Sequence, residues 1–340
     1  KRMAKLIVVY NPDGASQEKI RSLLPPGMVI EFFDSAVKYP ADTVFYYNMY
    51  GPGHEHIATH LEQGYRVIFD AKNEHYIQYY MLWVLYSFLQ HPGQGCFIIS
   101  GHEPNPLPGV KIIATPYWYW IMDQKEMTHT GVDQISWQPR PNQKKFFMSL
   151  DKQRVERDYV FDSLGDQLLD SVHSYRSRGI YLPNDQHSLN VLQQRYINPD
   201  WMHSTAFTLA VETYVDEKDT TGYSLTLKNH LFLCEKSYKP IAAQHPILLV
   251  STSGNLAYLR SQGFETFSEL FDESYDDVLD WKQRVQRIVQ QVQEFDQRSV
   301  NQPSVLEKLQ HNQARFFDQT ITADLKYRTI QQPLSEFVNE

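Results

Sequence analysis

Short apolar runs alternate with mixed polar stretches along the first part of this chain. The runs fall at residues 6–10, 28–33, 43–48, 66–70, 96–100 and 110–115. Continuous apolar runs of this length are typical of parallel strands that are buried on both faces. Helical stretches separate several of them, at residues 17–24, 54–63 and 74–90. This succession of strands and helices predicts an α/β domain with a doubly wound sheet.

The same pattern begins again after a polar connection at residues 123–144. Strands are predicted at residues 145–150, 206–213 and 247–251, and helices at 154–169, 235–243 and 255–262. From residue 277 the chain is polar and helical, with segments at 281–297, 304–318 and 320–340. We therefore expect an N-terminal domain over residues 1–140 and a C-terminal domain, with terminal helices, over 141–340. Two Rossmann-like domains of this kind are expected to face a cleft and to bind a ligand at the carboxyl ends of their strands.

Composition narrows the class of partner. Hydrophobic residues make up 42% of the chain and charged residues 21%, and the formal net charge is −8. Polymeric nucleic acid is therefore disfavoured as a partner, because it normally requires a basic surface. The two cysteines, Cys96 and Cys234, lie far apart, which favours a reducing compartment such as the cytoplasm. No apolar run is long enough to span a bilayer and no signal peptide is visible, so we expect no membrane span.

The leading candidate for ligand binding is the pair Glu235 and Lys236, at the expected start of a helix. A helix N-terminus offers free amide groups and positive potential, which favour phosphate. A lysine there adds a point charge, and a carboxylate can accept hydrogen bonds from both hydroxyls of a ribose. Lys239 follows within one turn and adds a second cation. The alternative is an ordinary helix start, in which Glu235 stabilises the helix dipole and both lysines are solvated.

Two arginines and a further carboxylate follow other predicted strands of the second half. Arg154 and Arg157 are three residues apart on the opening turn of a helix, so both can face one side and bind a diphosphate. Alternatively they are solvated, with Glu156 and Asp158 as their partners. Glu212 ends an apolar strand, where a carboxylate either lines a crevice or begins a solvated loop.

The first half offers candidates for a general base. His54 and Glu55 follow a predicted strand and a Gly-Pro-Gly turn, and Asp70 ends the next strand, so any of the three could face the cleft. The sequence does not distinguish among them. His56 and His60 are four residues apart on a helix, a spacing that suits a metal pair, but no third ligand is evident. A structural or surface role is therefore favoured for this pair, and no metal site is expected.

Motifs that the chain lacks restrict the chemistry further. It has no G-x-x-x-x-G-K-[ST] and no G-x-S-x-G, which disfavours nucleoside triphosphatase and hydrolase functions. It also has no D-x-D triplet, the usual carboxylate clamp for a metal-bound sugar nucleotide. Any sugar transfer is therefore expected to be metal-independent, with arginine, lysine and helix termini neutralising the diphosphate. The aromatic run YWYW at 117–120 either lines a ligand site or packs as a hinge between the domains.

The order of motifs in the second half resembles the donor domain of the family 10 glycosyltransferases, the α1,3-fucosyltransferases. That family carries a strand and an Arg-containing helix start, then K-F-x-L-x-F-E-N, Y-V-T-E-K, an alanine-bearing helix and I-P-I-x-x-G. The corresponding segments here are KFFMSLDKQRVERDYVFDSL (145–164), AFTLAVETY (206–214) and LFLCEKSYKPIAAQHPILLVS (231–251). Thr213 and Cys234 stand where the family has Asn and Thr. Residues 263–276 lie outside the family's motifs and are similar to segments of uncharacterised phage and cyanobacterial proteins.

The resemblance implies a GT-B-like glycosyltransferase, whose N-terminal domain binds the acceptor and whose C-terminal domain binds the donor. It implies that Glu235 holds the ribose, that Lys236 and one of the two arginines hold the diphosphate, and that Glu212 belongs to the donor pocket. The expected co-substrate is a nucleotide sugar, with a GDP-sugar as one candidate, and no cofactor is expected. Transfer to a saccharide or another hydroxyl acceptor would proceed with inversion. The alternatives are a non-catalytic nucleotide- or saccharide-binding protein and a phage-type DNA-modifying sugar transferase, which the acidic charge disfavours.

Overall fold

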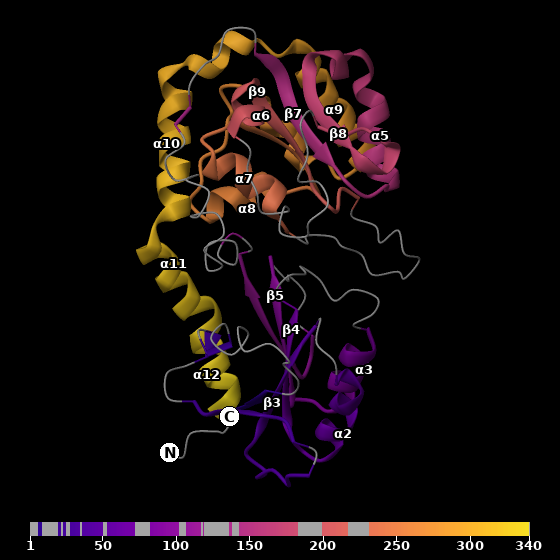
Figure 1. The fold of residues 1–340 in the computed structure, drawn as a ribbon, viewed down its shortest axis with the longest axis vertical. Helices are drawn as coiled ribbons and strands as arrows, with labels where there is room; N and C mark the ends of the chain where they lie inside the picture. Colours follow the sequence, from indigo (N-terminus) through magenta and orange to yellow (C-terminus); the bar gives the residue numbers. More distant parts are fainter. Residues whose placement is uncertain are drawn as a thin grey trace. The chain divides into compact units, whose positions relative to one another are not determined.

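The chain divides by its internal contacts into two compact units, Lys1–Tyr119 with Thr320–Glu340, and Trp120–Gln319. This division differs from the predicted boundaries 1–140 and 141–340, because the C-terminal end of the chain is grouped with the first unit. The computed structural model (Figure 1) describes residues 6–8, 20–21, 23–24, 28–34, 36–49, 53–71, 82–101, 107–116, 118, 136–137, 143–182, 199–216 and 231–339. Most of the predicted connection 123–144 lies outside these residues. Both units are α/β and each contains a parallel sheet, as predicted.

The first unit contains a six-stranded parallel sheet in the order β2-β1-β3-β4-β5-β6. Its strands are β1 (Leu6–Val8), β2 (Ile30–Phe32), β3 (Val44–Asn48), β4 (Arg66–Ala71), β5 (Gly95–Ser100) and β6 (Val110–Thr115). They lie at the six predicted apolar runs, and β3, β4 and β5 are buried along almost their whole length. Because β2 and β3 lie on opposite sides of β1, the chain switches direction across the sheet between β1 and β3.

In the first unit, two helices lie between β3 and β4, and another precedes β5. They are the 3₁₀ helix η1 (His54–His56), α2 (Ile57–Glu62) and α3 (Leu82–Gln90). Gly53 precedes η1 with a φ of 88°, and Gly64 follows α2 with a φ of 84°, conformations that favour glycine. The predicted helix 54–63 therefore begins as a 3₁₀ turn. The first part of the predicted helix 74–90 lies outside the described residues, as does the predicted helix 17–24 apart from residues 20, 21, 23 and 24.

The last turns of the C-terminal helices pack on the first sheet, from residue 327 onward. These helices are α11 (Gln319–Lys326), a π-helical turn (Tyr327–Gln331) and α12 (Gln332–Asn339), drawn in yellow in Figure 1. Arg66 of β4 donates from Nη1 to the carbonyl oxygens of Phe337 and Val338, at 2.9 and 3.0 Å. The hydroxyls of Thr115, at the end of β6, and Thr329 lie 3.0 Å apart. These contacts are the physical reason that the last segment belongs with the first unit.

The second unit contains a four-stranded parallel sheet in the order β10-β9-β7-β8. Its strands are β7 (Lys144–Leu150), β8 (Ser171–Tyr175), β9 (Thr205–Val211) and β10 (Ile247–Val250). Three of them lie at predicted strands, but β8 was not predicted. Its sequence SVHSY is largely polar and its first three residues are only half-buried, so it lacks the apolar run of a buried strand.

Helices connect these strands and continue to residue 317. They are α5 (Val155–Leu164), η5 (Gly165–Asp170), η6 (Arg176–Arg178), α6 (Pro199–His203), α7 (Glu235–Ala242), α8 (Asn255–Ser261), η8 (Glu273–Asp277), α9 (Trp281–Glu294), η9 (Gln297–Asn301) and α10 (Pro303–Phe317). The predicted helix 154–169 is thus an α-helix followed by a 3₁₀ helix. Asp280 begins α9, because its side chain accepts a hydrogen bond from the amide of Gln283.

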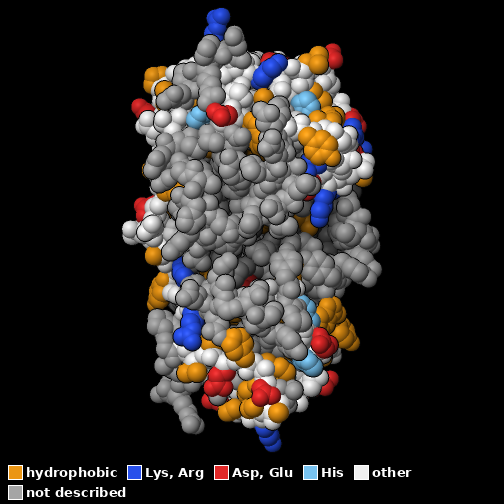
Figure 2. Space-filling model, in the orientation of Figure 1, with side chains coloured by type: hydrophobic (Ala, Val, Ile, Leu, Met, Phe, Trp, Pro, Cys, Tyr) orange, Lys and Arg blue, Asp and Glu red, His pale blue; other side chains and the backbone are white. Residues whose placement is uncertain are grey.

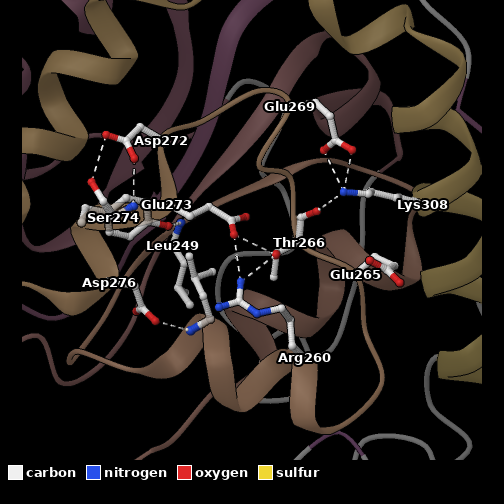
Figure 3. Close-up of polar contacts among 12 residues, drawn as sticks. Leu249, Arg260, Glu265, Thr266, Glu269, Asp272, Glu273, Ser274, Asp276 and Lys308 are labelled. Carbon is white, nitrogen blue, oxygen red and sulfur yellow. Dashed lines mark hydrogen bonds and ion pairs between the residues drawn. The ribbon is translucent and has the colours of Figure 1, made fainter.

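Polar contacts hold the segment between α8 and α9 in place (Figure 3). Arg260 donates from Nη1 to Glu273 Oε2 at 2.8 Å and to the Thr266 hydroxyl at 2.9 Å. Lys308 of α10 lies between the Glu269 carboxylate and the carbonyl oxygen of Thr266, at 2.8 Å from each. The segment 263–276, which the sequence analysis singled out, is therefore tied both to α8 and to α10.

Asp276 is the buried acid of this segment, and its side chain accepts a hydrogen bond from the amide of Leu256 at the start of α8, at 2.9 Å. Burial raises its pKa from 3.8 to about 6, against the opposing effects of the Leu256 amide and of Arg284. The folded state therefore binds more protons than the unfolded state between about pH 4 and pH 6. Over that interval the free energy of unfolding should fall as pH rises.

Replacing Asp276 with asparagine is expected to remove this part of the pH dependence. In the unsubstituted protein, the free energy of unfolding should fall by on the order of 1–3 kcal/mol between pH 4 and pH 7 because of Asp276. Urea unfolding of both proteins at a series of pH values between 4 and 7 measures it. Identical pH dependence of the two unfolding free energies would contradict the assignment.

Among the helices of the described residues, none is long and apolar enough to cross a membrane.

Candidate functional site

The carboxyl edge of the second sheet brings together most of the residues predicted to bind a ligand. In the order β10-β9-β7-β8 the chain runs from β7 to β8 on one side and later returns to β9 on the other side. The loops that leave β7 and β9 therefore diverge at the switch point between these two strands. In open parallel sheets this is where ligands bind, because the diverging loops leave a crevice. Arg154 follows β7 and Glu212 follows β9, so both lie at this edge.

The two arginines differ in their surroundings. Arg154 is the residue before α5, with an extended backbone, and its guanidinium carbon lies 5.3 Å from the centre of the Tyr214 ring. Arg157, in the first turn of α5, is only 4% exposed. Its Nη1 donates to the carbonyl oxygen of Lys152 at 3.0 Å, and its Nε has no hydrogen-bond partner among the described residues. A buried guanidinium with an unused donor is a prearranged site for an anion.

The predicted alternative of solvated arginines does not describe Arg157, which is buried, whereas Arg154 is partly exposed. Asp158 accepts hydrogen bonds from Arg178 Nε and from the Tyr175 hydroxyl, both at 2.9 Å. The carboxylate next to Arg157 is therefore occupied by another arginine. Burial, and secondarily the neighbouring Arg154, lower the pKa of Arg157, against the opposing effect of Glu212.

Glu212 joins the end of β9 to the beginning of α7. Its side chain is 1% exposed, and Oε1 accepts hydrogen bonds from the amide of Cys234 at 3.0 Å and from the Ser237 hydroxyl. Its own amide donates to the carbonyl oxygen of Val250, the last residue of β10, at 2.9 Å. The other carboxylate oxygen, Oε2, has no partner in the described part of the chain. Glu212 therefore sets the position of the α7 N-terminus at the switch point.

Glu235 and Lys236 form the first turn of α7, as predicted from sequence. Lys236 Nζ lies 3.3 Å from Glu235 Oε1 and 3.2 Å from the sulfur of Cys234. Both side chains are mostly buried, with 22% and 19% exposed. Burial alone would raise the pKa of Glu235, but the charges of Lys236 and Lys239 outweigh it and hold that pKa below its ordinary value. The carboxylate of Glu235 therefore stays charged at neutral pH.

Lys236 remains cationic despite its burial. Burial alone would lower its pKa, but Cys234, Glu235 and Glu212 outweigh that effect and raise it. Arg157 acts on Lys236 in the opposite direction, so the two cations are close enough to repel each other. The site thus holds a cluster of six charged side chains. Four are cations, Arg154, Arg157, Lys236 and Lys239, and two are carboxylates, Glu212 and Glu235. An anion carrying two negative charges balances this arrangement.

Two residues that the sequence analysis missed support the site. Ser237 is fully buried, and its hydroxyl contacts Glu212. Arg284 of α9 is 1% exposed and donates from Nε to the carbonyl oxygen of Ser251 at 2.8 Å, and to the carbonyl oxygens of Val215 and Val278. It therefore connects the loops after β9 and β10. No local pattern marks either contact, because Glu212 lies 25 residues from Ser237, and Ser251 and Val215 lie 33 and 69 residues from Arg284.

The three candidates for a general base lie in the first unit, at or after the ends of β3 and β4. Asp70 is buried and accepts a hydrogen bond from the Tyr46 hydroxyl. The Glu55 side chain is 71% exposed and forms an ion pair of 3.7 Å with His56. His54 donates from Nε2 to the carbonyl oxygen of Asn48 at 2.8 Å, since a carbonyl can only accept. This bond leaves Nδ1 of a neutral His54 as a proton acceptor.

Of the two histidines His56 and His60, His60 has a structural role, whereas the His56 side chain is 43% exposed. His60 is buried, stacks on Phe45 with ring centres 3.7 Å apart, and lies 2.6 Å from the Tyr47 hydroxyl through Nδ1. Burial, and secondarily His56, lower the pKa of His60 to about 4. Within the described residues no group of three His, Cys, Asp or Glu side chains could hold a metal ion. Of the aromatic run 117–120, only Trp118 is described, and it is completely buried.

Comparisons of the chain with protein-family models, with curated proteins and with solved structures find no match. The resemblance to the family 10 glycosyltransferases therefore stays a prediction from the sequence motifs.

Proposed function

We propose that this protein is a GT-B-like glycosyltransferase that moves a sugar from a nucleoside diphosphate sugar to a hydroxyl acceptor. The observation that supports the proposal is the cluster of charged side chains at the switch point between β7 and β9, in which Arg157 and Glu212 are buried. When a sugar is transferred, the nucleoside diphosphate leaves with additional negative charge. Fixed cations at that position stabilise the transition state more than the bound donor, which is the requirement for catalysis. The cluster supplies such cations from two segments of the chain, the start of α5 and the first turns of α7.

In this proposal each residue of the cluster has a separate role. Arg157 offers its unused Nε to a phosphate oxygen, and Lys236 adds a point charge at the N-terminus of α7. Glu235 accepts hydrogen bonds from the hydroxyls of the ribose. Arg154, stacked near Tyr214, adds charge at the edge of the site. Glu212 is a positioning residue, because its Oε1 is already bonded to Cys234 and Ser237.

Among the three candidate bases, we assign the role to His54. Asp70 is buried and occupied by Tyr46, and Glu55 projects into solvent beside His56. The His54 ring is held by its bond to the Asn48 carbonyl and by contact with the Phe69 ring, with centres 5.2 Å apart. A base held through one ring nitrogen presents the other in a fixed direction, which is the arrangement used in general base catalysis.

The proposed reaction is a single displacement with inversion. His54 Nδ1 takes the proton of the acceptor hydroxyl as its oxygen attacks the anomeric carbon of the donor sugar. The bond from that carbon to the diphosphate oxygen breaks, and its electron pair leaves with the nucleoside diphosphate. Arg157 and Lys236 neutralise the developing charge, so the transfer is expected to persist in the presence of EDTA. The resemblance described above makes a GDP-sugar the first donor to test.

Calorimetric titration with GDP, UDP, CDP and ADP, followed by incubation with the matching nucleotide sugars, tests this function. We expect one nucleoside diphosphate to bind, and its sugar conjugate to be hydrolysed or transferred. His54→Ala should keep that binding while lowering the rate by about 100-fold or more. Binding without hydrolysis or transfer would favour the non-catalytic alternative, and no binding by any of the four diphosphates would refute the proposal.

A further inference from the structure

Arg178 of η6 is fixed against the first two turns of α5. Its Nε donates to Asp158 Oδ1 at 2.9 Å, and its Nη1 and Nη2 donate to the carboxylate of Asp162, four residues further along the helix. Its guanidinium carbon lies 5.2 Å from the centre of the Phe161 ring and 5.1 Å from the centre of the Tyr175 ring. Figure 2 shows acidic and basic side chains next to each other on the second unit, on the side where Figure 1 places α5. Arg178 is therefore held in one position by two carboxylates and two aromatic rings.

Other side chains bind the rest of the Asp158 carboxylate. The Tyr175 hydroxyl donates to Oδ1 at 2.9 Å, and Gln153 Nε2 donates to Oδ2 at 3.0 Å. Burial alone would raise the pKa of Asp158, but the hydrogen bonds from these two residues and from Arg178 outweigh it and lower that pKa. Asp158 is therefore a charged carboxylate, and both of its oxygens have partners other than Arg157.

Asp158 would be free to approach Arg157 if Arg178 did not hold it. The two residues are consecutive in the first turn of α5, and Tyr175, whose hydroxyl binds Asp158, also acts on the charge of Arg157. Arg157 is 4% exposed, and its Nε has no hydrogen-bond partner among the described residues. A buried guanidinium attracts a free carboxylate strongly, because little water screens the two charges. A carboxylate paired with Arg157 would occupy the donor that an anion needs.

We infer that Arg178 is a positioning residue of the anion site, because it holds Asp158 and thereby keeps this carboxylate from pairing with Arg157. The unused Nε of Arg157 is in this way kept for a phosphate oxygen. The identity of the anion as a nucleoside diphosphate rests on the proposed function, but the competition of two arginines for one carboxylate does not. If Arg178 only stabilised α5, its effect on anion binding would not depend on the charge of Asp158. Competition makes the effect depend on that charge.

Calorimetric titration with inorganic pyrophosphate tests this competition. We expect Arg178→Met to weaken pyrophosphate binding by about tenfold, because the anion must then displace Asp158 from Arg157. Adding Asp158→Asn to Arg178→Met should restore the affinity to within about twofold of the unsubstituted protein, because the amide carries no charge with which to compete. Arg178→Lys keeps a positive charge beside Asp158, so its affinity should lie between those of Arg178→Met and the unsubstituted protein.

A second ion-paired arginine of the same unit is the matched control. Arg260 donates to Glu273 at 2.8 Å, and Arg260→Met should leave pyrophosphate binding unchanged. Circular dichroism of each variant shows whether it remains folded. Equal affinity of Arg178→Met and the unsubstituted protein would overturn the inference. So would a loss of affinity that Asp158→Asn does not restore, because Arg178 would then act only through the stability of α5.

A crystal structure of Arg178→Met gives a result that needs no ligand. We expect an oxygen of Asp158 within hydrogen-bond distance of the Arg157 guanidinium. An Asp158 that stays bonded to Tyr175 and Gln153, away from Arg157, would overturn the inference whether or not an anion binds. Failure of pyrophosphate and of every nucleoside diphosphate to bind the unsubstituted protein concerns the proposed function instead, so the two failures are distinguishable.

Discussion

Replacing Arg157 with alanine is expected to weaken the binding of the nucleoside diphosphate by about 100-fold. The guanidinium is 4% exposed, its Nε has no partner among the described residues, and it lies beside Lys236 at the start of α7. A hydrogen bond to a charged group in such a buried place contributes roughly 3 kcal/mol, which corresponds to about two orders of magnitude in affinity. Calorimetric titration of the unsubstituted protein and the variant with the diphosphate that binds measures the difference.

Two further arginine variants make this result specific. Arg157→Lys retains the charge but not the planar donor geometry, so its affinity should fall between those of the other two proteins. Arg298→Ala removes an exposed arginine of η9 on the same unit, and should leave diphosphate binding unchanged. Thermal unfolding of each variant shows that the titration is carried out on folded protein. If Arg157→Ala binds the diphosphate as tightly as the unsubstituted protein does, the donor site does not include Arg157.

Replacing Arg284 with methionine is expected to lower the free energy of unfolding by about 4 kcal/mol. Its guanidinium donates to the carbonyl oxygens of Ser251, Val215 and Val278. Methionine fills much of the same volume but donates no hydrogen bond, so these buried carbonyl groups are left unsatisfied. The loops after β9 and β10 also lose their connection, so the affinity for the diphosphate should fall as well. Urea unfolding measures the first effect, and titration of the folded variant measures the second.

The matched control lies on the same helix. Arg287 of α9 is exposed, so Arg287→Met should change the free energy of unfolding by less than about 0.5 kcal/mol. A similar stability for Arg284→Met and Arg287→Met would show that the three carbonyl contacts of Arg284 do not contribute. A large loss of stability with full affinity for the diphosphate would show that Arg284 stabilises the unit without shaping the site.

The local pattern of apolar residues was sufficient to predict most strands of both sheets. The predicted run 110–115 coincides with β6, and the other predicted strands differ from the observed bounds by one to three residues. These runs are informative because strands buried on both faces must be apolar at every position. β8 was missed for the same reason: SVHSY lies at the edge of its sheet and is half-buried, so burial does not require an apolar sequence there. The helix predicted through residue 169 is observed as α5 and η5, which end at residue 170, directly before β8.

The candidate site was predictable in its position but not in its contacts. Parallel strands place their carboxyl ends at one edge, so Arg157, Glu212 and Glu235 could be grouped from their places after strands and at helix starts. Their environments could not be predicted in this way. The bond from Ser237 to Glu212 joins residues 25 apart, and the bond from Arg284 to Val215 joins residues 69 apart. Residue spacing contains no information about such pairs, because it reports only on neighbours along one element.

The sequence by itself determined that this protein is α/β, that parallel sheets form in both halves, and that α7 begins at Glu235. Each of these follows from the periodicity of apolar residues and from helix-start signals, which act over a few residues. Only the tertiary structure decided which charges are buried, that Glu212 holds α7 in place, and that residues from 327 onward pack on the first sheet. It also placed His54 beside Trp83. Those outcomes depend on strand order and on side chains that meet across long stretches of sequence, where the free energy of burial outweighs local preference.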